Sequence, residues 1–101
     1  MQNYQTRAPR LDLNLPLHFF SSDEMIPGHC VNVSASGMLA VFNLPIDLWL
    51  EGDISFFIED QHFSIKARVI RVDGGDIGFR FHIDSDADKL TIQELLSLAE
   101  R

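Results

Sequence analysis

Apolar and polar residues alternate along most of the chain after residue 10. From residue 11 to residue 19 every second position is apolar, and the positions between hold polar residues or Pro16. This period of two is typical of a half-buried β-strand. Similar apolar stretches return at 29–33, 38–42, 54–58, 63–69 and 77–83. The pattern therefore predicts six short strands.

Turn residues separate these stretches. We expect breaks at Pro27-Gly28, at Gly37 and at Glu51-Gly52-Asp53, and a short reversal at Asp60-Gln61. Residues 73–76 read Asp-Gly-Gly-Asp, which is a two-residue hairpin signal. Residues 43–50 are expected to form a connection. The apolar face shifts between Val69 and Val72, which predicts a β-bulge.

The last part of the chain has a different period. Ser85 to Asp88 has the form of a capping box, and apolar residues then follow at i, i+3, i+4 and i+7, namely Ile92, Leu95, Leu96 and Ala99. A C-terminal amphipathic helix is predicted. Six short strands and one helix indicate a mainly β domain, a six-stranded antiparallel barrel, because closure removes exposed strand edges.

Composition limits the class of protein. A chain of 101 residues with 46% hydrophobic residues fits one globular domain without a disordered half. Cys30 is the only cysteine and no apolar leader precedes Arg7, so we expect a cytoplasmic protein. No apolar run approaches the roughly 20 residues that span a bilayer, so no membrane insertion is expected.

The charge is unevenly distributed. The formal net charge is −7, which disfavours non-specific binding to nucleic acid. The first ten residues nevertheless contain Arg7 and Arg10 and no acidic residue. The N-terminal segment is therefore the part of the chain best suited to a small anion.

Catalytic and metal-binding patterns are weak. Four histidines and Cys30 lie on separate predicted strands without short ligand spacing, and no nucleophile elbow or phosphate loop is present. We therefore expect no enzymatic activity, no metal and no cofactor.

Two motifs are more specific. Arg7 and Arg10 stand just before the first strand, and Asn32, Ser34 and Gly37 form an Asn-x-Ser-x-x-Gly pattern on the second. In these motifs the chain resembles the PilZ domain family, which carries Arg-x-x-x-Arg before the first strand and Asp/Asn-x-Ser-x-x-Gly later. The resemblance implies a Greek-key-like barrel and a bacterial receptor for cyclic di-GMP, acting in motility or biofilm regulation.

The resemblance extends over nearly the whole chain. The turn at 52–53, the strand at 67–71 and the strand at 77–81 followed by a helix agree with the family in order and spacing. The arginine motif departs from it, because Thr6 occupies the position of the outer arginine and Arg7 stands beside it. By this resemblance, residues 1–10 form a flexible ligand-binding segment and residues 11–101 form the barrel with its helix.

The proposed ligand-binding residues have suitable chemistry. A guanidinium group on Arg7 or Arg10 can hold a phosphate or the edge of guanine with paired hydrogen bonds. Asn32 offers a donor and an acceptor to guanine, and Ser34, two residues along the same strand, offers a hydroxyl on the same face. Gly37 permits a positive φ and a close backbone approach.

Two other interpretations remain open at this point. Asn32, Ser34 and Gly37 can form an Asx-type turn without any ligand. If Thr6 makes the arginine motif degenerate, the domain is an adaptor that binds a protein partner in pilus, motility or secretion machinery and no nucleotide. Trp49 is expected in the core or at the end of the barrel, and an exposed Trp49 would mark a partner surface.

Overall fold

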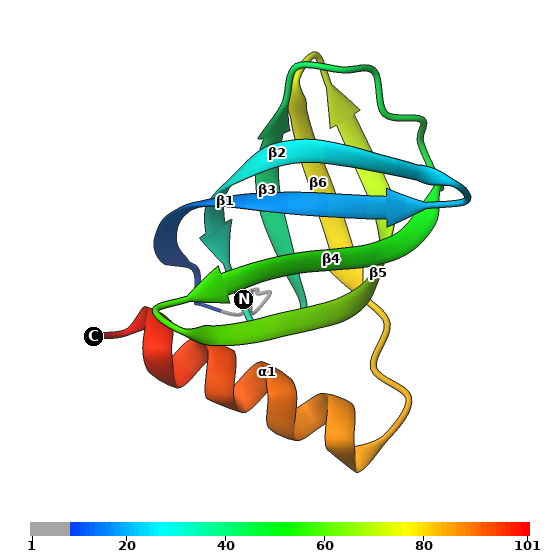
Figure 1. The fold of residues 1–101 in the computed structure, drawn as a ribbon. Helices are drawn as coiled ribbons and strands as arrows, with labels where there is room; N and C mark the ends of the chain where they lie inside the picture. Colours follow the sequence, from blue (N-terminus) through cyan, green and yellow to red (C-terminus); the bar gives the residue numbers. More distant parts are fainter. Residues whose placement is uncertain (1–8) are drawn as a thin grey trace, which may run out of the picture.

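The structure is a computed structural model that describes residues 9–101, and it is a closed antiparallel barrel with one helix beneath it (Figure 1). The strands follow one another around the barrel in the order β1-β2-β3-β6-β5-β4. The predicted six-stranded barrel with a C-terminal helix is confirmed. Its elements are β1 (Leu11–Ser21), β2 (Glu24–Val33), β3 (Gly37–Phe42), β4 (Glu51–Ile58), β5 (Gln61–Asp73), β6 (Asp76–Phe81) and α1 (Asp86–Ala99).

The alternating apolar positions fill the inside of the barrel. Phe19 and Phe79 meet edge to face with their ring centroids 4.9 Å apart, and Phe56 stacks on Phe63 at 5.5 Å. These side chains and their aliphatic neighbours are almost completely buried. The barrel interior is therefore a packed core.

Several predicted turns agree with the structure. Asp73 pairs with Asp76 across a two-residue turn, and Gly74 takes the left-handed conformation there, with φ at 61°. The predicted bulge lies between Val69 and Arg71 on β5. The reversal predicted at Asp60-Gln61 lies one residue earlier, at Glu59 and Asp60, because β4 ends at Ile58 and β5 begins at Gln61.

Two predicted breaks were wrong. Pro27 and Gly28 lie inside β2, because a Cβ on Gly28 would come within 2.5 Å of the Phe42 ring and the glycine makes room for that side chain. Gly52 lies inside β4, where a Cβ would stand 2.1 Å from the Phe20 carbonyl oxygen. Glycine at these positions serves close packing within a sheet, a role that the sequence pattern does not separate from turn formation.

The helix α1 begins at the predicted cap. The Ser85 hydroxyl accepts a hydrogen bond from the Asp88 amide at 3.1 Å, and the Asp84 amide donates to the Asp88 carboxylate at 2.9 Å, which lowers the pKa of that carboxyl group. Ile92 and Leu95 are buried against the barrel, where α1 meets β1 and β5. In the described chain, no helix has the length and apolar character to cross a bilayer.

Candidate functional site

One end of the barrel brings together two residues of the predicted motifs. Arg10 directly precedes β1, and the start of β1 pairs with the end of β2, where Asp12 stands opposite Asn32. The Arg10 Nη1 atom donates a hydrogen bond to Asn32 Oδ1 at 2.7 Å. The arginine and the asparagine thus contact each other although 22 residues separate them. Arg7, the other predicted arginine, lies outside the described residues.

Ser34 has a different place from the one predicted. The strand β2 ends at Val33, so Ser34 does not extend the strand face that carries Asn32. Its backbone amide donates to the Gly37 carbonyl at 2.8 Å. The buried Ser34 hydroxyl accepts from the Ser36 amide at 3.3 Å. Ser34 therefore shapes the turn between β2 and β3.

Of the two properties predicted for Gly37, a close backbone approach and a positive φ, the structure shows the first. A Cβ at this position would stand 2.1 Å from the carbonyl oxygen of Phe79 on β6, so the close backbone approach is confirmed. The predicted positive φ is wrong, because Gly74 is the one glycine with a positive φ in the described range 9–101. Gly37 is needed because a side chain there would separate β3 from β6.

Arg80 was not among the predicted site residues. It pairs with Gly37 in the β3–β6 ladder, and the neighbouring amide of Phe81 donates to the Ser36 carbonyl at 2.9 Å. The turn of residues 34–37 therefore lies between the Arg10–Asn32 contact and Arg80. Arg80 is exposed, and among residues 9–101 it has no ion-pair partner. Its position on the polar face of the last strand was visible, but its neighbour on β3 followed only from the topology.

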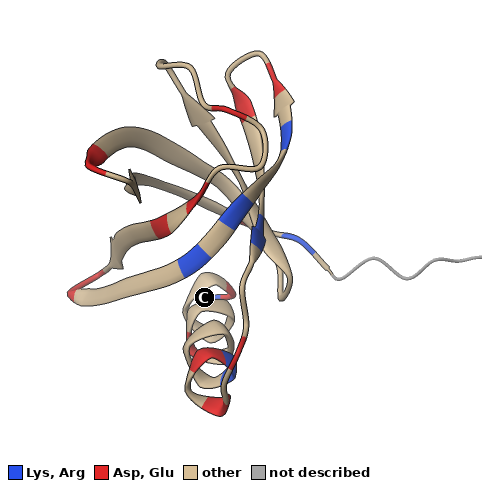
Figure 2. Ribbon diagram, turned by 90° about the vertical axis from the view of Figure 1, so that its right-hand side faces the viewer, with Lys and Arg blue, Asp and Glu red and all other residues tan. Residues whose placement is uncertain are grey.

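A third arginine nearby is already paired. Arg68, which stands opposite Arg80 on β5, forms an ion pair with Glu51. In Figure 2, Lys and Arg residues lie along β5 and at the point where the first described residues enter the barrel. Asp and Glu residues lie mostly on α1 and in the turns. Asp12 adds one carboxylate beside Asn32. This end of the barrel thus offers two exposed guanidinium groups that form no ion pair within residues 9–101, those of Arg10 and Arg80.

A separate groove lies on the outside of β4 and β5. Its volume is about 280 Å³, and it mixes acidic and basic side chains. The imidazole of His82 at its border contacts the Asp84 carboxylate at 2.9 Å. Within residues 9–101, no three His, Cys, Asp or Glu side chains gather in a way that suits a metal ion.

The described part of the chain is a small barrel with a packed interior and a polar, arginine-bearing end. The sequence model of the PilZ domain matches residues 4–98. The chain belongs to the PilZ domain family, whose members are regulatory binding domains.

A solved structure has the same fold. The crystal structure of the PilZ domain of CeSA from a cellulose synthesizing bacterium superposes with a TM-score of 0.82, covering 93% of this chain and 100% of that chain at 17% sequence identity. Among curated proteins, none matches this sequence significantly. At this identity the likeness extends to the fold alone.

Proposed function

We propose that this PilZ domain binds cyclic di-GMP at the barrel end that carries Arg10 and Asn32 and transmits the binding event to a protein partner. The observation that carries the proposal is the 2.7 Å hydrogen bond from Arg10 to Asn32. It supports a single recognition surface that combines the leading segment with the end of β2. Arg7 belongs to the same proposed surface.

The chemistry of the ligand matches these groups. Cyclic di-GMP presents two phosphates and two guanines, and guanidinium binds phosphate oxygens or the guanine O6 and N7 atoms with parallel hydrogen bonds. Binding would release Arg10 from Asn32, so that the arginine turns to a phosphate and the amide turns to a guanine edge. The turn of residues 34–37 follows the end of β2 that carries Asn32.

Arg80 provides a further cation for the same ligand. Thr6 stands where the family pattern has its outer arginine, with Arg7 beside it, and Arg80 borders the turn from the opposite side. Gly37, which pairs with Arg80, has no side chain, so it cannot screen Arg80 from the turn. We assign Arg80 the role of a second phosphate or guanine contact.

Isothermal titration calorimetry with cyclic di-GMP at physiological salt tests the proposal. We expect binding at one or two ligands per chain and an affinity roughly ten- to a hundred-fold weaker in Arg10→Ala, because one charge-assisted contact is worth about 1.5–3 kcal/mol. Arg101→Ala is the matched control and should bind like the parent. Thr6→Arg should bind more tightly. Absence of binding heat, or equal affinity of the parent protein and Arg10→Ala for cyclic di-GMP, would contradict the proposed site.

The adaptor that binds no nucleotide is the second candidate. Thr6 favours it, because the arginine motif is incomplete. Calorimetric silence of both the parent protein and Thr6→Arg at high protein concentration would support the adaptor. In either case we propose that the domain works in the bacterial cytoplasm, in regulation of motility or biofilm formation.

A further inference from the structure

The end of the barrel opposite Arg10 carries exposed apolar side chains on two neighbouring segments. The connection between β3 and β4 contributes three of them, with Trp49 60%, Leu44 54% and Leu48 45% exposed. The far end of β5 contributes Ile70 and Val72, which are also exposed. We call these five residues the apolar rim.

Backbone hydrogen bonds hold the two segments side by side. The Trp49 amide donates to the Val69 carbonyl at 2.9 Å, and the Val69 amide donates to the Leu50 carbonyl at 2.8 Å. At the other end of the connection, the Phe42 amide donates to the Gly75 carbonyl at 2.9 Å. The connection is therefore tied to β5 near Val69 and to the β5–β6 turn at Gly75, so the two segments that carry the apolar rim adjoin at both places.

The connection buries one residue and exposes its neighbours. Ile46 is buried in the barrel core, whereas Trp49 projects its indole toward solvent from a left-handed backbone with φ at 72°. This conformation is strained for a bulky residue. Monomeric proteins rarely leave a contiguous apolar patch exposed, and tryptophan is enriched where partners bind.

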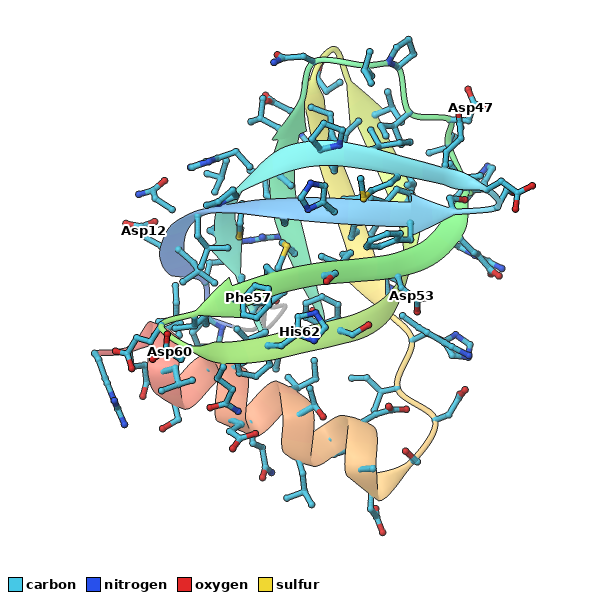
Figure 3. All side chains as sticks on the ribbon, viewed as in Figure 1. Asp12, Asp47, Asp53, Phe57, Asp60 and His62 are labelled. Carbon is cyan, nitrogen blue, oxygen red and sulfur yellow. The ribbon has the colours of Figure 1, made fainter. Side chains whose placement is uncertain are left out.

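The charges around the apolar rim indicate the kind of partner. The two segments, 43–50 and 69–76, contain Asp47, Asp73 and Asp76 against Arg71 alone, and because Arg71 pairs with Asp73 at 3.8 Å, Asp47 and Asp76 carry the excess negative charge. Figure 3 shows Asp47 projecting outward from the connection at the upper right of the barrel. A second copy docked through the same surface would bring like charges together, and an anionic lipid surface would be repelled.

We propose that the apolar rim docks a basic, apolar-faced segment of a protein partner, with Trp49 as the central anchor. The acidic side chains would meet the lysines or arginines of that segment, and the rim would cover its apolar face. This surface lies at the opposite ends of β3 and β6 from Gly37 and Arg80. It does not depend on nucleotide binding.

Trp49 reports directly on the proposal because it is the only tryptophan in the chain. The probes are a synthetic amphipathic leucine/lysine peptide, a leucine/glutamate peptide of the same pattern and anionic phospholipid vesicles. We expect the lysine peptide to move Trp49 emission to shorter wavelength with saturation, and the glutamate peptide and vesicles to leave it unchanged. Sedimentation velocity should show a monomer throughout the concentration range used.

Variants connect the fluorescence change to the apolar rim. Leu44→Ser and Leu48→Ser keep the reporter and should weaken lysine-peptide binding at least ten-fold, as expected for anchors next to a hot spot. Phe57→Ser is the matched control, because Phe57 is 61% exposed but lies near the far end of β4 (Figure 3). Circular dichroism checks that each variant folds. Equal binding of both peptides, a shift with vesicles, self-association with a Trp49 shift, or equal affinity in the serine variants would overturn the proposal.

Discussion

The backbone of Gly37 lies against the carbonyl group of Phe79 so closely that a Cβ on Gly37 would stand 2.1 Å from that oxygen. The contact joins β3 to β6 directly beside Arg80. It ties the turn of the Asn-x-Ser-x-x-Gly motif to the strand that closes the barrel. The motif glycine thus has a structural role that holds with or without a ligand.

Gly37→Ala should therefore destabilise the domain. A methyl group forced against backbone costs about 1–3 kcal/mol or more, because neither strand can move aside without breaking ladder hydrogen bonds. Urea denaturation measures the free energy of unfolding. Gly74→Asn is the control, since no atom lies within 4 Å of a Cβ there and asparagine tolerates the left-handed conformation. A Gly37→Ala protein as stable as the parent would contradict the close approach.

Ser34→Ala should act on stability before it acts on ligand binding. The Ser34 hydroxyl is buried within its own turn and accepts from the Ser36 amide. Its removal should cost about 0.5–1.5 kcal/mol, and Ser36→Ala should cost less because Ser36 is exposed. Thermal denaturation compares the two. An unchanged stability together with a ten-fold loss of cyclic di-GMP affinity would mean that the hydroxyl serves the ligand instead.

Features that depend on neighbouring residues in the sequence were predictable, and features that depend on contacts between distant strands were not. Periods of two and 3.6 residues are local, so the strands, the Gly74 turn and the Ser85 cap were predictable. Strand neighbours are set by the topology, so the pairing of Arg80 with Gly37 was not. The end of β2 at Val33 was also hidden, and the turn that follows it moves Ser34 off the predicted face. Trp49 was expected in the core or at a barrel end, and its exposure fits the interpretation as a partner surface.

Arg80→Ala should weaken cyclic di-GMP binding without changing stability. Its guanidinium has no ion-pair partner among residues 9–101, so its loss leaves no buried charge behind. We expect roughly a ten- to hundred-fold lower affinity, as for the loss of one charge-assisted contact. Arg71→Ala, at the opposite end of the barrel, is the control. Equal affinities in the two variants would exclude Arg80 from the site.

Cys30 should be chemically inert in the folded protein. Burial raises the pKa of its thiol to about 12, and the reactive species is the thiolate. A thiol reagent near pH 8 should react with Cys30 only after denaturation. Because the unfolded chain loses this proton near pH 9.0 and the folded chain retains it, the thiol contribution makes unfolding easier as pH rises from about 9 to 12. Rapid labelling of the native protein would contradict the burial.

The side-chain amide of Asn32 gives the most direct test of the central claim, that the ligand takes the place of the Arg10–Asn32 contact. Titration of ¹⁵N-labelled protein with cyclic di-GMP can follow the two Asn32 amide protons by nuclear magnetic resonance, with the side-chain amide of Gln61 as an internal control. We predict large shifts for Asn32 and for the backbone amides of residues 34–37, with Gln61 unchanged. Saturable binding that leaves the Asn32 amide unmoved would contradict the account.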